Sequence, residues 1–389
     1  MRVDHLRLVG SPQTNVVMAA ELSRLAARGL KRRPPEPRKH GPGSLVYPFD
    51  AELADLAVRY QRTATRVLWD LYASRASRLE PLYDELRADA AADDRPWWWD
   101  GATLSLRARN LGGFAAGAMQ VVGAVKNAIV EAAAARGARL RVDPERPDLP
   151  LVLRMGDDEL TLSLDLGGGS QSQRGWRREA GEAPLREHLG AVLLMLARWD
   201  ARTDVLVDPM CGSGTIPIEA ALMARAEPLV PRLDGALARL PAFAGVTGPR
   251  GALFADAEPA IIGNELDARL LAGARRNAVA AGAAARIELL AGDFRDLAPR
   301  RIHELAAARG RSAGAGVILS NPPYGERLDP GDLASLYRDL GAWCRGFRGW
   351  RAAFLVANRD FEGAFGGRPR IKKPLANGPV RGYFLLYDL

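Results

Sequence analysis

The stretch Val205-Leu-Val-Asp-Pro-Met-Cys-Gly-Ser-Gly-Thr215 decides the fold, because it joins an apolar strand to a helical run through a glycine-rich turn. Strand, glycine-rich turn and helix form the opening unit of a nucleotide-binding α/β fold. The turn has neither the Gly-Lys-Ser/Thr of a P-loop nor the Gly-x-Gly-x-x-Gly dinucleotide spacing. An acid at the strand end and a short Gly-x-Gly suit a ligand with an amino group and no phosphate, such as S-adenosylmethionine.

A second informative stretch, Val317-Ile-Leu-Ser-Asn-Pro-Pro-Tyr-Gly325, is an apolar strand that runs into a polar turn. Its two prolines restrict the backbone and remove two donors, so the turn is stiff and presents acceptors. Asn321 offers its side-chain carbonyl, Pro322 its backbone carbonyl, and Tyr324 a flat face for stacking. An exocyclic amine on a nucleobase needs two acceptors and a platform. The predicted catalytic residues are therefore Asn321, Pro322, Pro323 and Tyr324.

Together the two stretches resemble the amino-methylating class I methyltransferases, and most closely the bacterial family that methylates guanine N2 in large-subunit ribosomal RNA. The resemblance covers roughly residues 55 to 389. It implies an α/β fold: a Rossmann-like methyltransferase domain with a mostly parallel seven-stranded sheet, preceded by an α+β ferredoxin-like and THUMP region that binds RNA. The segments that carry the resemblance are Asp208–Thr215, Ile218–Ala221, Ser320–Asp329, Arg62–Leu68 and Arg174–Arg178.

The length of 389 residues suggests two or three domains. The resemblance places a ferredoxin-like subdomain at residues 1–55 and a THUMP domain at 56–166. A Gly/Ser-rich linker is predicted at 167–183 and the methyltransferase domain at 184–389. Residues 225–260 form an unusually long connection, which is either a substrate-facing insertion or a loop in solvent; both alternatives remain open.

Hydrophobic periodicity predicts helices over 16–30, 56–80, 121–136, 185–199, 216–226 and 268–281. It predicts a hairpin of 151–153 with 159–166. Further strands are predicted at 204–208, 261–264, 286–290, 316–320, 352–357 and 382–388. Strands that alternate with helices favour a parallel sheet covered on both faces.

Asp208 ends the first strand of the methyltransferase region, where its carboxylate can receive the ammonium of the cofactor. The alternative is an Asp that caps the following helix. Gly212 and Gly214 are expected to let the cofactor pass close to the backbone. Residues predicted to line the same site are Met210, Cys211 and Thr215.

Two further acids follow later strands. Glu265 is predicted to hold both ribose hydroxyls, while Asp267 is interpreted as the N-cap of the next helix. Asp293 is predicted to accept from the adenine amino group, with Phe294 beside the ring; the alternative is a simple turn Asp.

The net charge of +8 is compatible with a polyanionic partner, although Arg and Ala enrichment also accompanies a GC-rich genome. Arg174-Gly-Trp-Arg-Arg178 places an aromatic residue among cations, which suits stacking on an unpaired base. The predicted RNA contacts are Arg174, Arg177, Arg178 and Arg327, with solvated loops as the alternative.

Composition excludes several classes of protein. No apolar run reaches the ~18 residues of a membrane helix, and Asp4 and His5 interrupt the position of a secretory signal. Two cysteines and four histidines predict neither a zinc site nor disulfides. We expect a cytoplasmic monomer that needs no metal and, because the chain ends at Leu389, carries no second fused methyltransferase.

The leading hypothesis is S-adenosylmethionine-dependent methylation of the N2 amine of a guanosine in 23S ribosomal RNA. One alternative places the same chemistry on tRNA. A second is adenine-N6 methylation of DNA, and a third is an RNA-binding protein with a silent site.

Overall fold

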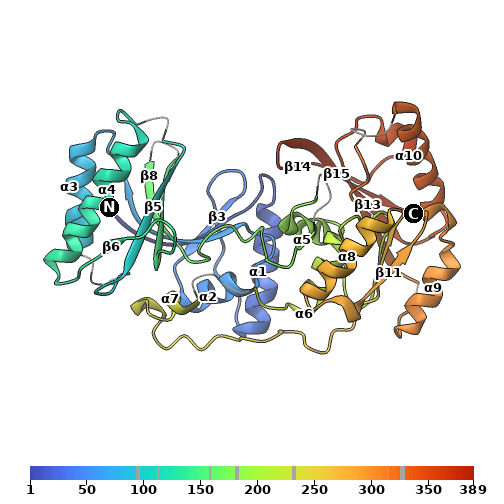
Figure 1. The fold of residues 1–389 in the computed structure, drawn as a ribbon, viewed down its shortest axis with the longest axis horizontal. Helices are drawn as coiled ribbons and strands as arrows, with labels where there is room; N and C mark the ends of the chain where they lie inside the picture. Colours follow the sequence, from blue (N-terminus) through green and yellow to red (C-terminus); the bar gives the residue numbers. More distant parts are fainter. Residues whose placement is uncertain are drawn as a thin grey trace. The chain divides into compact units, whose positions relative to one another are not determined.

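The computed structural model describes residues 1–92, 94, 97–111, 114–156, 159–179, 184–229, 234–312, 314–324 and 329–389. The chain forms two compact units (Figure 1). The predicted domain limits at residues 55, 166 and 183 stay predictions. Unit 1 comprises Met1–Gly10, Met18–Gln171 and Leu229–Arg250, and unit 2 comprises Ser11–Val17, Ser172–Pro228 and Gly251–Leu389.

The described residues of unit 1 form an eight-stranded sheet in the order β2-β3-β1-β4-β8-β7-β5-β6. β5 pairs in parallel with β6 and β7, and the remaining pairs are antiparallel. The predicted helices at 16–30 and 121–136 and the predicted hairpin are confirmed as α1, α4 and β7–β8. The strands are β1 (Arg2–Val9), β2 (Arg38–Lys39), β3 (Ser44–Pro48), β4 (Arg66–Ser74), β5 (Thr103–Arg109), β6 (Arg141–Val142), β7 (Leu149–Gly156) and β8 (Glu159–Asp165); the helices in this part of the chain are α1 (Asn15–Gly29), α2 (Ala51–Tyr60), α3 (Leu79–Ala92) and α4 (Ala118–Ala135).

The prediction of one helix over 56–80 is wrong. Helix α2 ends at Tyr60, Gln61 adopts an extended conformation, and β4 follows at Arg66–Ser74. Strand β4 lies between β1 and β8 and is buried along nearly its whole length. A strand buried on both faces has no polar alternation, so its apolar residues also fit a helical spacing.

The long connection over 225–260 is not a loop in solvent, because its middle part belongs to unit 1 and contributes buried residues to it; the substrate-facing alternative stays a prediction. Here α7 (Asp234–Leu237) and the 3-10 turn η1 (Pro241–Phe243) pack their apolar residues inward. The Phe243 ring lies 6.1 Å from that of Phe49, edge to face. At the end of the segment, Arg250 donates to the buried carboxylate of Asp55 at 2.7 Å. We call Leu229–Arg250 the strap.

The described residues of unit 2 form a seven-stranded sheet in the order β11-β10-β9-β12-β13-β15-β14. The first five strands are mutually parallel, and β15 is antiparallel to both β13 and β14. This confirms the predicted, mostly parallel α/β sheet. The strands are β9 (Val205–Asp208), β10 (Ile261–Glu265), β11 (Ile287–Ala291), β12 (Gly316–Ser320), β13 (Arg351–Val356), β14 (Ile371–Asn377) and β15 (Val380–Asp388); the helices are α5 (Glu187–Leu196), α6 (Thr215–Arg225), α8 (Ala268–Ala280), α9 (Pro299–Ala308), α10 (Pro330–Cys344) and α11 (Phe361–Phe365), with 3-10 turns η2 (Ala284–Arg286) and η3 (Phe294–Asp296).

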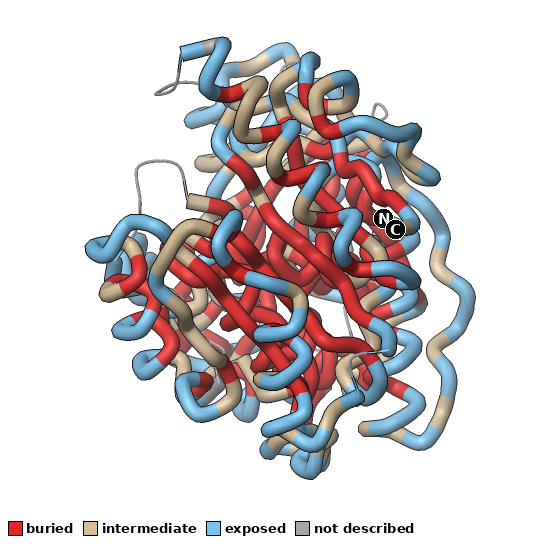
Figure 2. The backbone as a smooth tube through the Cα atoms, turned by 90° about the vertical axis from the view of Figure 1, so that its right-hand side faces the viewer, coloured by how far each residue is buried: buried red, intermediate tan, exposed pale blue. Residues whose placement is uncertain are grey.

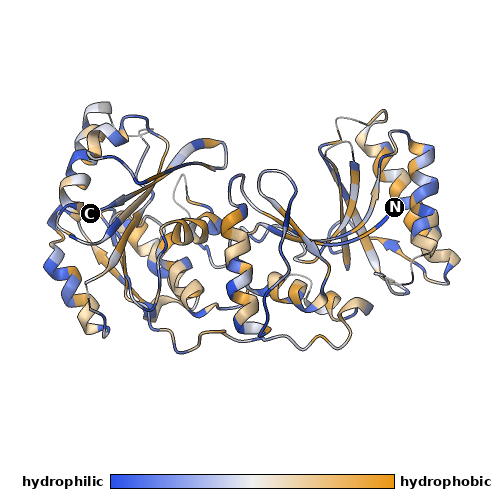
Figure 3. Ribbon diagram, turned by 180° about the vertical axis from the view of Figure 1, so that it is seen from behind, coloured by the Kyte–Doolittle hydropathy of each residue, from blue (hydrophilic) through white to orange (hydrophobic). Residues whose placement is uncertain are grey.

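Two hydrophobic layers cover the two faces of this sheet. Along β9, Leu206 packs with α5 and α6 on one face, whereas Val205 and Val207 pack with α9 and α10 on the other. The strands are therefore buried (red in Figure 2) and mostly hydrophobic (orange in Figure 3). No helix in the described ranges is both long and apolar enough to cross a membrane.

Strand β14 was not predicted from the sequence. Among the described strands it is the last in the order of the sheet, beside β15, and it carries Lys372, Lys373 and Pro374. Charged residues and proline are typical of sheet edges, where they block further strand pairing. The predicted strands at 352–357 and 382–388 correspond to β13 and β15, which pair in antiparallel orientation, and a tight hairpin joins β14 to β15.

Two glycines of α10 provide a test of the packing between α10 and α11. A Cβ on Gly341 would lie 2.0 Å from the backbone oxygen of Phe365, whereas a Cβ on Gly331 would meet no atom within 4 Å. We expect Gly341→Ala to lower the free energy of unfolding by about 1–3 kcal/mol or more. Gly331→Ala should leave it unchanged or raise it by up to about 1 kcal/mol. Urea unfolding followed by circular dichroism measures both; equal stability of the two variants would contradict the packing.

Candidate active site

The carboxyl ends of β9, β10, β11 and β12 border a cavity of about 670 Å³ within unit 2. The chain runs outward from β9 to β10 and β11 on one side and returns as β12 on the other. A crevice at such a switch in strand order is where α/β sheets bind ligands. The predicted site residues that line this cavity are Asp208, Met210, Cys211, Gly212, Thr215, Glu265, Asp293, Asn321, Pro322, Pro323 and Tyr324.

The two glycines of the first turn differ in what they do. Gly212 has a φ of 54° and open space where a Cβ would lie, so a ligand can approach its backbone. Gly214 precedes α6 with a φ of 84°, and a Cβ there would lie 3.2 Å from the Cβ of Ala274 in α8. Gly214 does not line the cavity in the structure; its small size serves helix packing.

Asp208 is 2 % exposed and accepts hydrogen bonds from Ser320 Oγ at 2.7 Å and from the Met210 backbone at 3.3 Å. Burial raises the pKa of Asp208 to about 7, and the nearby Glu265 raises it further, while both donors oppose the shift. Both donors are neutral groups. A buried carboxylate in this position is stabilised by a ligand cation.

Glu265 already holds the backbone at this edge of the sheet. Its Oε2 accepts from Gly212 N at 2.8 Å and its Oε1 from Asp267 N at 2.9 Å. Each carboxylate oxygen retains a lone pair for a ligand hydroxyl. Asp267 accepts from the first turn of α8 and is its N-cap, as predicted.

Asn264 was missed in the sequence analysis, although a polar residue at the end of an apolar strand is a usable signal. Its buried side-chain amide donates to the backbone oxygens of Pro209, at 3.3 Å, and Gly292, at 2.8 Å. It therefore fixes the turns that follow β9 and β11 relative to each other.

Asp293 caps the short turn η3 by accepting from Arg295 N at 2.9 Å, and its other oxygen pairs with the Arg295 guanidinium at 2.7 Å. Asp293 also lines the cavity, so its role as a cap is compatible with the predicted contact to the adenine amino group. Phe294 borders the cavity too, but its ring is 4 % exposed and packs edge to face on Trp343.

The turn after β12 is braced from two sides. Tyr324 donates its hydroxyl to Asn321 Oδ1, and Tyr337 of α10 donates to the backbone oxygen of Pro323 at 2.7 Å. Burial raises the pKa of Tyr324 to about 12, so its hydroxyl keeps its proton near neutrality. The carbonyl of Asn321 thus has a fixed orientation and one acceptor position left for a ligand.

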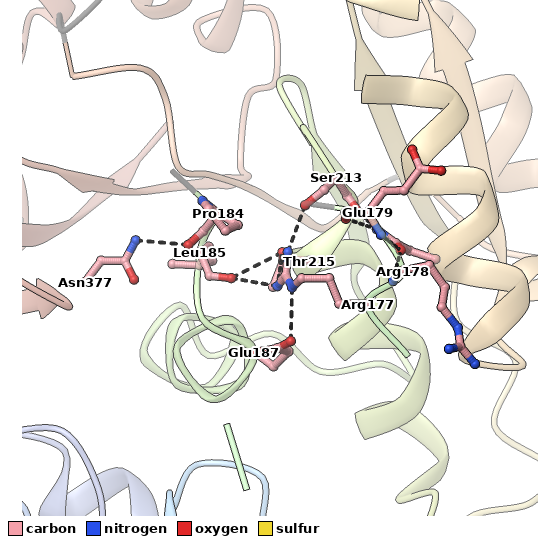
Figure 4. A network of polar contacts seen from close by, with 10 residues as sticks. Arg177, Arg178, Glu179, Pro184, Leu185, Glu187, Ser213, Thr215 and Asn377 are labelled. Atoms are coloured by element: carbon pink, nitrogen blue, oxygen red, sulfur yellow. Dashed lines mark hydrogen bonds and ion pairs between the residues drawn. The ribbon is translucent and has the colours of Figure 1, made fainter. Parts of the chain in front are cut away.

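Arg177 contacts the glycine-rich turn and the N-terminal end of α5 (Figure 4). Its guanidinium donates to Ser213 Oγ at 2.9 Å, Thr215 Oγ1 at 3.0 Å, Leu185 O at 2.8 Å and Glu187 Oε1 at 3.0 Å. The prediction that Arg177 contacts RNA is not supported, because all of these bonds lie inside unit 2. Arg177 instead positions the turn.

The prediction that Arg174 contacts RNA is not supported either. Its side chain is 3 % exposed and pairs at 2.5 Å with Glu219, whose side chain is fully buried. Trp176, which lies between Arg174 and Arg177 in the sequence, is 5 % exposed, so its ring offers no face to an unpaired base. Sequence alone shows a basic, aromatic segment; its pairing partners lie on distant helices.

Arg178 is exposed and stays a predicted RNA contact. Its backbone amide is held by Asn277 Oδ1 at 2.7 Å, and the same buried Asn277 donates to Ser213 O at 3.0 Å. Arg327 and the neighbouring Glu326 lie outside the described residues. In the described part of the chain, no group of three or more His, Cys, Asp or Glu residues could hold a metal ion.

Comparison with known proteins places these residues in a family. The model of the family UPF0020, described as RMKL-like, methyltransferase domain, matches residues 174–384. The chain is 36% identical over 285 residues to a protein of Syntrophotalea carbinolica named ribosomal RNA large subunit methyltransferase K/L, covering 68% of this chain and 38% of that protein. A protein of the same name from Methylococcus capsulatus is 33% identical over 359 residues, covering 85% and 45%.

The chain thus spans less than half the length of the curated relatives it matches. Among solved structures, the crystal structure of SMU.472, a putative methyltransferase complexed with SAH, superposes with a TM-score of 0.78. The match covers 100% of this chain and 98% of that one at 23% sequence identity, which shows a shared fold.

The corrected role of Arg174 is testable. Arg174→Ala leaves the Glu219 carboxylate buried without its ion-pair partner, so we expect a loss of about 3–5 kcal/mol in the free energy of unfolding. The matched control Arg178→Ala removes an exposed neighbour and should change stability by no more than about 0.5 kcal/mol. Chemical unfolding measures both, and a stable Arg174→Ala protein would contradict the buried pair.

Proposed function

Because the chain belongs to the family of RMKL-like methyltransferase domains, we propose that it is an RNA methyltransferase that uses S-adenosylmethionine to methylate the N2 amine of a guanosine in 23S ribosomal RNA. The observation that carries the proposal is the meeting of two turns in one cavity. The glycine-rich turn after β9 and the Asn-Pro-Pro-Tyr turn after β12 line the same 670 Å³ space.

The acidic residues fit the cofactor. The buried carboxyl of Asp208 suits an ammonium group, Glu265 retains acceptor positions for ribose hydroxyls, and Asp293 suits the adenine amino group. When bound, S-adenosylmethionine supplies a methyl group on a positively charged sulfur. Gly212 leaves the backbone open to it.

The Asn-Pro-Pro-Tyr turn prepares the amine. The lone pair of a guanine amino group is delocalised into the ring, and it becomes available when both amino hydrogens are accepted. Asn321 Oδ1 and the backbone carbonyl of Pro322 are the proposed acceptors, and Tyr324 is the proposed stacking platform, worth about 1–3 kcal/mol. An amide is not a strong base, so the proton leaves to water after transfer. Catalysis then rests on positioning and on a fixed arrangement of dipoles.

The alternative substrates are a tRNA guanosine and a DNA adenine. They are separated by incubating the purified protein with labelled S-adenosylmethionine and, in parallel, protein-free 23S RNA, tRNA or DNA, and then digesting the product to nucleosides for mass spectrometry. N2-methylguanosine from 23S RNA supports the proposal. N2-methylguanosine from tRNA alone, N6-methyladenine from DNA, or no product in any substrate would overturn it.

We also propose that unit 1 carries the THUMP-type RNA-binding function and that the enzyme works in the cytoplasm.

Asn321→Ala removes the proposed side-chain acceptor. We expect methyl transfer to fall by about 100-fold or more, while the dissociation constant for S-adenosylhomocysteine, measured by calorimetry, changes little. Tyr324→Phe is the matched comparison, because it keeps the stacking ring and loses only the hydroxyl bond that orients Asn321; it should lower activity by much less than Asn321→Ala, which removes the acceptor itself. An active Asn321→Ala enzyme would refute the assigned role.

The affinity for S-adenosylhomocysteine should depend on pH. The pKa of Asp208 is raised from its ordinary 3.8 to about 7, so the free protein holds a proton there below pH 7. An ammonium group favours the carboxylate, and binding therefore releases this proton at low pH. We expect affinity to rise about tenfold per pH unit as pH approaches 7 and to level off above it. Asp208→Asn should remove this dependence; a pH-independent wild-type affinity would contradict the contact.

A further inference from the structure

A second cavity, of about 810 Å³, lies entirely within unit 1 on one face of its sheet. Helices α3 and α4 pack beside each other on the opposite face of the same strands (Figure 1). Along β5, Leu104 is fully buried, whereas Arg107 and Arg109 are exposed. The alternation of a strand therefore places a row of arginines on the cavity side.

Four arginines from four separate segments line this arginine cavity: Arg66 of β4, Arg107 of β5, Arg146 of the β6–β7 connection and Arg239 of the strap. Arg66 is committed to the buried carboxylate of Asp165. Among the described residues, the other three form no ion pair. Arg239 lies over the ring of Trp99 at 4.3 Å, a cation–π contact that orients its guanidinium.

The acids of the cavity do not neutralise these arginines. Asp148 accepts from Thr103, at 2.9 Å through the backbone amide and 3.0 Å through the hydroxyl, and Asp165 holds Arg66. Glu145 remains as a counter-charge among the lining residues, and Asp143, which accepts from the Arg146 backbone amide at 2.9 Å, lies near the Arg146 charge.

The shape and chemistry point to a nucleic acid strand. Guanidinium groups bind phosphate through paired N–H donors. The cavity is larger than one phosphate needs, and its lining includes Ser105, whose hydroxyl oxygen is able to accept from a ribose hydroxyl. A 2′-hydroxyl contact separates RNA from DNA.

We propose that the arginine cavity of unit 1 holds the phosphates and ribose of an RNA strand through Arg107, Arg146 and Arg239. The proposal rests on the proposed RNA methyltransferase function and assigns a substrate-binding site to unit 1 that is separate from the cavity of unit 2.

The test compares two double variants with the same change in charge. Arg107→Ala/Arg146→Ala removes two exposed cavity arginines, and Arg78→Ala/Arg87→Ala removes two exposed arginines at α3, on the opposite face. The probe is in vitro transcribed 23S ribosomal RNA, with binding measured by filter retention over a series of salt concentrations. S-adenosylhomocysteine affinity, which belongs to unit 2, and thermal unfolding report on the integrity of each protein.

The cavity variant should bind RNA roughly tenfold or more weakly. The slope of log K against log salt should become shallower by about 1.4, because each of the two lost phosphate contacts on a single strand contributes about 0.7. The control should match the wild type, and cofactor affinity should be unchanged in both. Equal RNA affinity in the two double variants, or equal losses in both, overturns the proposal.

Two further arms separate other ligands. Single-stranded DNA of the same sequence should bind the wild type more weakly than RNA; equal binding overturns the ribose contact. If AMP binds the wild type, and the cavity substitutions abolish this binding but leave the affinity for RNA unchanged, the cavity belongs to a free nucleotide and the RNA site is overturned. An enzyme that binds RNA through the cavity but methylates no guanine contradicts the proposed function alone. Guanine methylation with an unchanged KM for RNA in the cavity variant contradicts this site alone.

Discussion

The hydrogen bond from Ser320 to Asp208 joins the ends of β9 and β12, the two adjacent strands between which the order of the sheet changes direction. Everything in the site of unit 2 is arranged around that junction. The turn after β9 carries the open backbone of Gly212, and the turn after β12 carries Asn321 and Pro322, the proposed acceptors. Because both strand ends are buried and bonded to each other, the two turns keep a fixed separation, which a displacement between two bound molecules requires.

Much of this site was predictable because its signals are local. The glycine-rich turn and the Asn-Pro-Pro-Tyr turn each lie within one short stretch, and a parallel sheet necessarily brings their ends to one edge. The parts that were missed depend on contacts between distant segments. From the sequence alone, Arg174 and Arg177 resemble free cations. In the structure Arg174 pairs with Glu219, and Arg177 donates to Ser213 and Thr215. Strand β4 was read as helix because burial on both faces removes the alternation that marks a strand.

The arginines show why composition is a weak guide to RNA binding in this chain. Arg174 and Arg107 have the same side chain, yet Arg174 is buried against a carboxylate, whereas Arg107 lines a cavity and forms no ion pair with a described residue. The two arginines differ in whether the fold places a carboxylate beside the guanidinium group. An exposed arginine without a carboxylate partner retains its full capacity for phosphate, whereas a buried pair contributes to the fold and is lost to any ligand.

The strap has a consequence for how the chain matures. Unit 1 begins at the N-terminus, but Phe243 and Arg250, which complete its packing against Phe49 and Asp55, are synthesised only after the first strand and helix of the unit 2 sheet. A nascent chain emerges at a limited rate and domains tend to fold in the order of their synthesis. Here the packing of unit 1 is completed by a segment that lies in sequence between two segments of unit 2. Neither unit corresponds to a continuous stretch of gene, so cutting the coding sequence between them would leave both incomplete.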